Sequence, residues 1–352
     1  MNLFDYVRPA SIAEAVAAAS EPGAAYLAAG TNLLDLMKGG AMRPSRLVDI
    51  TRLPGLAKVE TLPDGGVSIG AMVRNADLAR DVDFATAYPA VAEALLSGAS
   101  PQLRNAATVG GNLMQRTRCA YFYDAASACN RRDPGAGCDA LGGENRSHAV
   151  LGWSDACIAT HPSDFCVPLV ALDAVVEIEG VNGSREMPLE EFLLLPGTTP
   201  EREHALETGE MIIALRLPRD AATFRSHARY LKLRERTSFA FALVSAAAAL
   251  RIEDGTIVAA RLSLGGVAAR PWRARAAEAA LEGSAPTTEA FARAADLALA
   301  DARPSGDNAF KIELAKRVVT RAFLLASTGT PDRMPALPAS AFSSDTGVTH
   351  HA

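Results

Sequence analysis

The chain has 352 residues, of which 49% are hydrophobic and 21% charged, a composition typical of a soluble globular protein with two or three structural units. Its formal net charge of −5, with no long basic run, disfavours nucleic acid and anionic membranes as partners. No signal-peptide pattern opens the chain, and its longest apolar run, residues 239–250, is shorter than the roughly 20 residues of a membrane span.

The first unit, residues 1–56, is predicted to be a strand–turn–helix–strand unit that Pro54-Gly55 ends. Residues 11–20 are an Ala-rich segment, with Ser11 as a helix N-cap and Glu14 three residues later. A buried strand at 24–28 runs through a turn into a helix at 33–38, and another strand follows at 46–50.

The second unit covers residues 57–220. We expect strands at 67–69 and 211–217, a helix at 84–96, a polar glycine-bearing loop at 99–112, and a helix that runs into a strand over 167–178. All of the cysteines fall in the intervening region, for which no regular structure is predicted.

The third unit covers residues 226–328. Strands are predicted at 228–233, 242–252 and 257–264, with Asp254-Gly255 as the turn between the last two. Ala-rich helices follow at about 271–282, 287–301 and 308–327. The tail at 329–352, rich in Pro, Ser, Thr and Ala, is predicted to be flexible.

Two turns have the chemistry of a phosphate-binding loop. In residues 28–34, Ala-Ala-Gly-Thr-Asn-Leu-Leu, small residues let the backbone approach a pyrophosphate, and Thr31 and neighbouring amides donate hydrogen bonds. In residues 104–113, Gly110-Gly111 gives the same close approach, beside Arg104, Thr108 and Asn112. Each turn also has a simpler interpretation as a plain connection, but two of them together favour a ligand. No Rossmann or P-loop fingerprint is present.

The five cysteines lie within a 48-residue window, and four of them have the spacing Cys119-x9-Cys129-x8-Cys138-x18-Cys157. This spacing leaves an iron–sulfur cluster, a zinc site and unpaired core thiols open, while the lack of a signal peptide disfavours disulfides. Nearby arginines at 116, 118, 131 and 132 are expected to offset cluster charge, and amides of residues 134–137 to face sulfur. His148 and His161 are predicted to be polar loop residues.

Four segments, 28–34, 104–112, 162–164 and 209–212, together resemble the FAD-binding subunit of the xanthine dehydrogenase (molybdenum hydroxylase) family, in one continuous order over residues 1–325. The resemblance implies an α+β chain. A two-subdomain PCMH-type FAD-binding fold occupies residues 1–220, with subdomains 1–56 and 57–220 and an iron–sulfur loop at 115–160. A smaller α/β C-terminal domain, of the CO dehydrogenase flavoprotein type, occupies residues 226–328.

Carried over by position, the resemblance implies FAD contacts along both turns and at three later positions. Members of the family usually have glycine where Ala28 or Ala29 stands. Ser163-Asp164 before an apolar run also has the pattern of a helix N-cap. The implied FAD-binding residues are Ala28, Ala29, Gly30, Thr31, Asn32, Leu33, Leu34, Thr108, Gly111, Asp164, Ile212 and Lys232.

The cysteine segment resembles the cysteine-bearing loop of bacterial periplasmic aldehyde oxidoreductase flavoproteins. The strings Thr-Arg-Cys at 117–119, Cys-Asn-Arg-Arg at 129–132 and Gly-Cys-Asp-Ala at 137–140 carry this resemblance. It implies that Cys119, Cys129, Cys138 and Cys157 bind a [4Fe–4S] cluster. Cys166 is interpreted as an ordinary buried thiol.

The implied function is electron transfer in a heterotrimer, with a large molybdenum-cofactor subunit, a small [2Fe–2S] subunit and an external electron acceptor. No catalytic residue is expected on this chain, because the redox chemistry belongs to the cofactors. Co-export with a signal-bearing partner implies the periplasm, with the cytoplasm as the alternative. The competing functions are a zinc-stabilised scaffold or assembly protein and a stand-alone flavin oxidase of the same fold. The substrate and the acceptor are left open.

Overall fold

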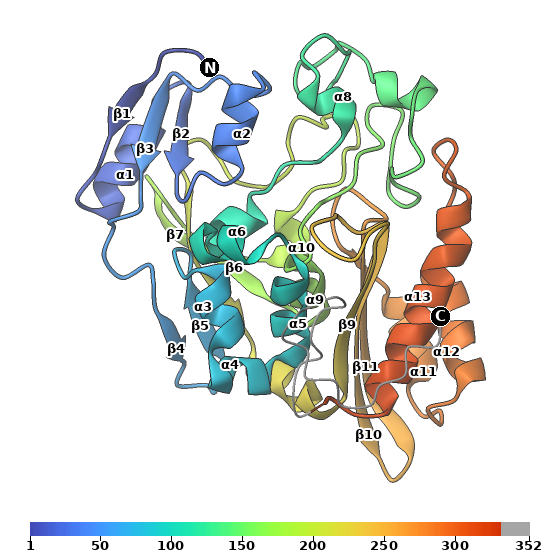
Figure 1. The fold of residues 1–352 in the computed structure, drawn as a ribbon. Helices are drawn as coiled ribbons and strands as arrows, with labels where there is room; N and C mark the ends of the chain where they lie inside the picture. The colour runs from blue at the N-terminus through green and yellow to red at the C-terminus, as the bar shows by residue number, and fades with distance from the viewer. Residues whose placement is uncertain (332–352) are drawn as a thin grey trace.

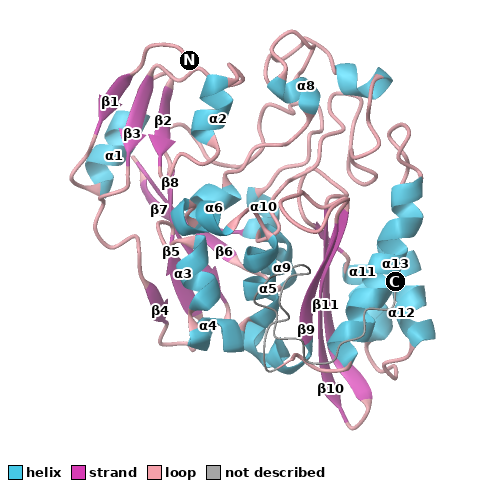
Figure 2. Cartoon of the chain, viewed as in Figure 1, coloured by secondary structure: helices cyan, strands magenta, loops and turns pink. Residues whose placement is uncertain are grey.

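The computed structural model describes residues 1–331, so most of the tail predicted at 329–352 lies outside the described residues. Three β-sheets follow one another along the chain, with helices packed around them (Figures 1 and 2). Each of the three predicted units contains one sheet. This arrangement confirms the predicted α+β class.

The first sheet is parallel and has the order β1-β3-β2. The hydroxyl of Ser11 accepts the amide of Glu14, as expected for the N-cap of α1. The predicted strands and helices of this unit are present as α1 (Ile12–Ala19), β2 (Ala24–Leu27), α2 (Leu33–Lys38) and β3 (Arg46–Asp49). The edge strand β1 (Asp5–Val7) was not predicted.

The second sheet is antiparallel and has the order β4-β5-β8-β6-β7. Its inward side chains share one apolar core with the helices that cover it. The strands are β4 (Val59–Thr61), β5 (Val67–Gly70), β6 (Val175–Gly180), β7 (Gly183–Pro188) and β8 (Met211–Leu217). The helices are α3 (Asn75–Arg80), α4 (Val82–Ala87), α5 (Pro89–Ser97), α9 (Cys166–Ala171) and α10 (Leu189–Phe192).

Two expectations for this unit are wrong. The single helix predicted at 84–96 is split into α4 and α5, because Pro89 lacks an amide proton and starts a new helix. The segment 99–112, predicted as a loop, contains α6 (Pro101–Ala106) and α7 (Val109–Leu113). Ser100 and Thr108 cap these short helices with their side-chain oxygens.

The third sheet is antiparallel, with the order β12-β11-β10-β9, and α11, α12 and α13 cover one of its faces (Figure 2). The predicted elements are again present, except that the first helix starts later than expected because a short strand precedes it. The elements are β9 (Ala228–Leu233), β10 (Val244–Glu253), β11 (Thr256–Gly265), β12 (Trp272–Arg273), α11 (Arg275–Leu281), α12 (Thr288–Ala298) and α13 (Phe310–Ser327).

Strand β10 is covered on both faces. Val244, Ala246, Ala248 and Leu250 belong to the core beneath α11–α13, whereas the alternate residues Ala247 and Ala249 belong to the core of the second unit. Side chains of a strand point alternately to opposite faces, so the alanine run places small side chains into both layers. The third sheet is thereby fixed against the second unit.

The cysteine segment has little regular structure beyond α8 (Ala120–Tyr123) and a 3₁₀ turn at Asp139–Gly142. It packs against the first unit, where Phe122 and Cys129 share a small core with Leu36 and Ala41. Figure 1 shows this segment, around α8, beyond one end of the third sheet. In residues 1–331, no helix combines the length and apolar character that crossing a bilayer requires.

Candidate functional site

The first turn connects β2 to α2. Gly30 has φ +74°, and a Cβ there would lie 2.8 Å from Leu34 Cδ1, so both backbone conformation and space favour glycine. The amide of Leu34 donates to the carbonyl of Gly30 at 3.1 Å, which closes the turn. Among residues 1–331, the amides of Thr31, Asn32 and Leu33 have no hydrogen-bond acceptor and are free for a ligand.

The second turn is the start of α7, and its amides are used differently. The amide of Gly110 donates to Ala71 O at 2.9 Å, and that of Gly111 donates to Thr108 Oγ1 at 3.3 Å. A Cβ at Gly110 would lie 2.9 Å from the Ala71 side chain, so this glycine allows α7 to pack directly on the second unit. Asn112 Oδ1 accepts the Ser163 hydroxyl at 2.7 Å, which joins this turn to the segment before α9.

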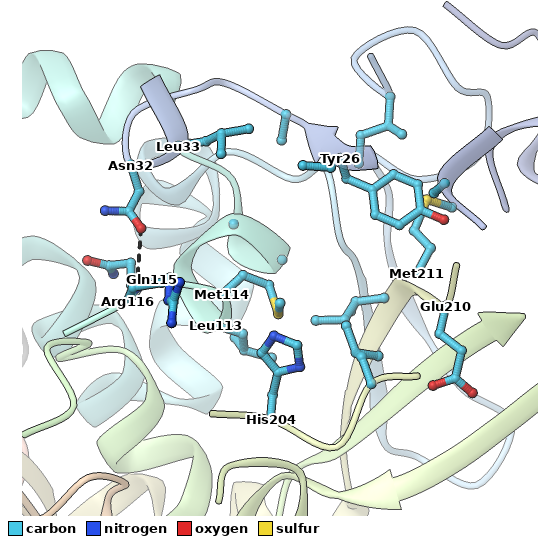
Figure 3. A pocket seen from close by; sticks show the side chains of 18 of the residues that line it. Tyr26, Asn32, Leu33, Leu113, Met114, Gln115, Arg116, His204, Glu210 and Met211 are labelled. Atoms are coloured by element: carbon cyan, nitrogen blue, oxygen red, sulfur yellow. Dashed lines mark hydrogen bonds between the residues drawn. The ribbon is translucent and has the colours of Figure 1, made fainter. Parts of the chain in front are cut away.

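A cavity of about 650 Å³ lies between the first and second units, with the two turns in its wall. Figure 3 shows side chains from both units facing each other across it, with Tyr26 and Leu33 on one side and Met114 and His204 on the other. Of the predicted FAD contacts, this cavity is lined by residues 28–33, Thr108, Gly111 and Ile212. Leu34 is not in its wall.

A second cavity of about 700 Å³ lies beside the third sheet, and Asp164 and Lys232 line it. Lys232 Nζ donates to Asp164 Oδ2 at 2.8 Å and to Ser97 O at 3.1 Å, and the Tyr230 hydroxyl donates to Asp164 Oδ1 at 2.6 Å. The alternative interpretation of Asp164 as a helix cap is wrong, because Ser163 accepts the first amide of α9. The buried ion pair instead joins the second unit to β9.

The two cavities form one extended site, because Thr31, Asn32 and Gly111 line both. Asn32 Oδ1 accepts the amide of Arg116 (Figure 3), whereas its buried Nδ2 has no partner among the described residues. Buried His204 Nδ1, in the first cavity, is likewise unpartnered in residues 1–331. Free amides, unpartnered polar atoms and a lysine in a long, partly apolar site fit a dinucleotide such as FAD.

The four predicted cluster ligands, Cys119, Cys129, Cys138 and Cys157, line one small pocket of about 10 Å³. Cys129 and Cys138 face each other in an isolated antiparallel bridge. The amide of Ala159 donates to the sulfur of Cys157 at 3.4 Å, whereas the amides of Phe122 and Leu141 donate to the carbonyls of Cys119 and Cys138. Amides that donate to sulfur, like that of Ala159, surround sulfur in iron–sulfur proteins and stabilise thiolates.

The four thiols that line this pocket are the right ligands for an iron–sulfur cluster, although the pocket itself is small. In the described chain, no three His, Cys, Asp or Glu side chains are spaced to hold a single metal ion, and the pocket has a volume of only about 10 Å³. Burial raises the pKa of the Cys119 thiol to about 11, so without a metal this thiol is protonated at neutral pH. The fifth cysteine, Cys166, is fully buried in α9 and lies outside this pocket.

The surroundings of the sulfurs differ from expectation. Of the four nearby arginines, Arg131 is the one that lines the cysteine pocket in the described chain. Arg132 instead donates to the carbonyls of residues 121, 122 and 124, and so braces the segment. Of the amides at 134–137 that were expected to face sulfur, those of Ala136 and Gly137 instead donate to Asp133 O and Asn130 Oδ1.

Both histidines that were predicted to be plain loop residues lie at the sites. His148 is buried, with Nε2 at 3.2 Å from Cys119 Sγ, and its carbonyl accepts Lys311 Nζ at 2.8 Å. His161 lines the first cavity. Both histidines make their contacts with residues that are distant in sequence. The only sequence signal for a role at these sites was that they lie close to the cysteines along the chain.

Comparisons with known proteins agree with this geometry. A family model described as the FAD binding domain in molybdopterin dehydrogenase matches residues 2–220, and one described as the CO dehydrogenase flavoprotein C-terminal domain matches residues 229–326. The chain is 48% identical to the aldehyde oxidoreductase FAD-binding subunit PaoB of Escherichia coli, over 91% of this chain and 96% of that protein. It is 30% identical to the carbon monoxide dehydrogenase medium chain of Hydrogenophaga pseudoflava, over 91% and 95% of the two chains.

Solved structures show the same similarity. A chain of carbon monoxide dehydrogenase from Hydrogenophaga pseudoflava superimposes with a TM-score of 0.72 at 31% identity, covering 93% of this chain and 98% of that one. A chain of quinoline 2-oxidoreductase from Pseudomonas putida 86 gives a TM-score of 0.71 at 26% identity, covering 93% and 99%.

Proposed function

Because this chain belongs to the family of FAD-binding subunits of molybdenum hydroxylases, we propose that it is the FAD- and [4Fe–4S]-binding electron-transfer subunit of a heterotrimeric molybdenum-dependent aldehyde oxidoreductase. In this proposal, a large molybdenum-cofactor subunit oxidises the aldehyde and a small [2Fe–2S] subunit delivers electrons to this chain. The aldehyde class rests on the similarity to the aldehyde oxidoreductase subunit, at 48% identity over nearly the whole chain.

The observation that carries the proposal is the shared wall of two candidate sites. Cys119 lines both the cysteine pocket and the second cavity, and His148 lies beside it in the same cavity. A centre bound by the cysteines is therefore next to a ligand in the extended site. Neighbouring redox groups of this kind are what an electron-transfer subunit needs.

The chain's own residues bind and orient the dinucleotide. The free amides of the first turn suit a diphosphate, and Lys232, held by Asp164, places a positive charge in the second cavity. FAD, when bound, supplies the electron exchange between the iron–sulfur centres and an external acceptor. No general acid or base on this chain is needed for that exchange.

The test is purification of the chain with its co-expressed partners under anaerobic conditions. We expect flavin absorbance near 375 and 450 nm, as generally seen for flavoproteins at roughly these wavelengths, together with molybdenum and acid-labile sulfide assigned to this subunit. A colourless chain with bound zinc would instead support the scaffold, and aldehyde or alcohol turnover by the isolated chain would support a stand-alone oxidase. Cell fractionation tests the predicted periplasmic location against the cytoplasm.

A matched pair of variants tests the cysteine assignment. Cys129→Ser removes a sulfur from the pocket, whereas Cys166→Ser changes a buried thiol outside it. The first should remove cluster iron and sulfide, and the second should leave both in place. Equal iron contents in the two variants would exclude the proposed ligand set.

A further inference from the structure

Three charged side chains lie between the first cavity and the cysteine pocket. Glu203 Oε2 accepts Arg131 Nη1 at 2.5 Å, and its other oxygen accepts Arg116 Nε. The side chains of Arg131 and Glu203 are only 4% and 14% exposed. Although burial acts to raise it, the two guanidinium groups hold the pKa of Glu203 below its ordinary value, so the carboxylate is charged at neutral pH.

This network touches both sites. Arg116 and Glu203 line the first cavity, and Arg131 lines the cysteine pocket together with Cys157. Arg116 also lies over the ring of Phe122, at 4.6 Å from its centroid, and Phe122 is a fully buried wall of the same pocket. The charges therefore lie in the partition between a dinucleotide site and four sulfurs.

The charges within the network do not cancel. Two guanidinium groups face one carboxylate, which leaves one positive charge in excess in a buried place, and Arg131 Nε has no partner among residues 1–331. An unbalanced buried charge is costly, whereas an adjacent anion offsets it. A cluster bound by four thiolates carries net negative charge, so it supplies that anion next to Arg131.

We propose that Arg131 and Glu203 are positioning residues that set the reduction potential of the centre bound by the four cysteines, Arg131 by its place in the wall of their pocket and Glu203 by holding and partly neutralising Arg131. This inference rests on the proposed function, because it needs a redox centre in the cysteine pocket. An electron added to that centre is stabilised by Arg131 and opposed by Glu203, and both effects are strong in a poorly solvated partition. Arg116, farther from the sulfurs, has a smaller effect of the same sign as that of Arg131.

The experiment is redox titration of the intact complex, with the cluster followed by electron paramagnetic resonance and flavin content measured in the same samples. Glu203→Gln should raise the cluster's midpoint potential, and Arg131→Gln should lower it. At a fixed applied potential, each change should alter the ratio of reduced to oxidised cluster by about fivefold, in opposite directions. Arg131→Lys keeps the charge and should restore most of the wild-type ratio.

The control is Glu278→Gln, which removes an equally buried carboxylate paired with Arg273 in the third unit, outside both cavities and the cysteine pocket. It should leave the potential unchanged. Shifts of the same sign in Glu203→Gln and Arg131→Gln, or a shift in Glu278→Gln as large as theirs, would overturn the inference. If Arg131→Gln loses its iron, the midpoint potentials of Glu203→Gln and Arg131→Lys test the inference in its place. A potential in Glu203→Gln that is not raised would then overturn it.

The outcomes separate this inference from the function on which it rests. A wild-type subunit without flavin or acid-labile sulfide contradicts the proposed function itself. A wild-type subunit that contains both, with a cluster potential that none of the charge variants moves, contradicts only the roles of Arg131 and Glu203.

Discussion

The dinucleotide cavities and the cysteine pocket share the residue Cys119, yet they are built in different ways. The cavities are open spaces of about 650 and 700 Å³, with free amides and unpartnered polar atoms in their walls. The cysteine pocket has about 10 Å³, and the amide of Ala159 already donates to one of its sulfurs, that of Cys157. The dinucleotide site is thus an open space with free donors in its wall, whereas the second site is a small pocket lined by four thiols.

The largest effect is expected from the loss of one cysteine, which should empty the cysteine pocket of iron and leave the dinucleotide site intact. Cys157→Ser removes a sulfur that accepts the amide of Ala159 and lines the cysteine pocket. We expect cluster iron to fall at least about tenfold, because a cubane needs four thiolates, while flavin content stays near that of wild type. Iron and flavin analysis of the purified complex measures both, and parallel loss of flavin would show that the sites are not built independently.

Lys232→Met tests the second cavity. Asp164 would keep its buried position without its cation, and breaking a buried pair in this way costs about 3–5 kcal/mol. We expect that loss in the free energy of unfolding measured with urea, together with reduced flavin content. The matched variant Lys316→Met breaks a more exposed pair with Asp296 and should lower the free energy of unfolding far less than Lys232→Met does.

Gly110→Ala tests how closely α7 must pack. The new Cβ would meet both the side chain and the carbonyl oxygen of Ala71, and overpacking of this kind costs about 1–3 kcal/mol. Flavin content and urea stability should both fall, with cluster iron unchanged. Gly142→Ala, in the cysteine segment, places its Cβ in open space and should leave all three measurements unaltered.

The smallest expected effect is a pH dependence from the first cavity. Burial lowers the pKa of His161 to about 4, below its ordinary 6.5, so its contribution to stability is complete above pH 6.5 and is lost as the pH falls through 4. Between pH 7 and pH 5.5 we expect a loss of about 1 kcal/mol from this group. Urea unfolding at the two pH values measures it. A His161→Gln variant with the same pH dependence as wild type would contradict the assignment.

Local sequence patterns predicted most elements within a few residues, because Ser11, the strand alternation and the Asp254-Gly255 turn act over short distances. Pro89, at the first position of α5, is the sequence signal for the split between α4 and α5. Helices α6 and α7 were missed, because their Gly and polar residues resemble those of a loop.

The candidate site was predictable where it lies along one segment, as in the first turn and the cysteine spacing. The resemblance implied that Asp164 and Lys232 each contact FAD, but it did not imply the ion pair between them, which joins residues 68 positions apart. The contacts of His148 with Cys119 and of Glu203 with Arg131 join segments that only the tertiary structure brings together. No periodicity or motif in the sequence encodes such pairs.

Strand β10 packs against the helices of its own domain on one face and against the second unit on the other. Because Ala247 and Ala249 enter the core of the second unit, a fragment that begins near residue 226 would leave one face of its sheet bare. An exposed apolar sheet face promotes self-association. The C-terminal domain therefore cannot be exchanged between relatives by cutting the chain near residue 226. Chimeric proteins should include α5 and α9, which pack on its sheet, from the same parent.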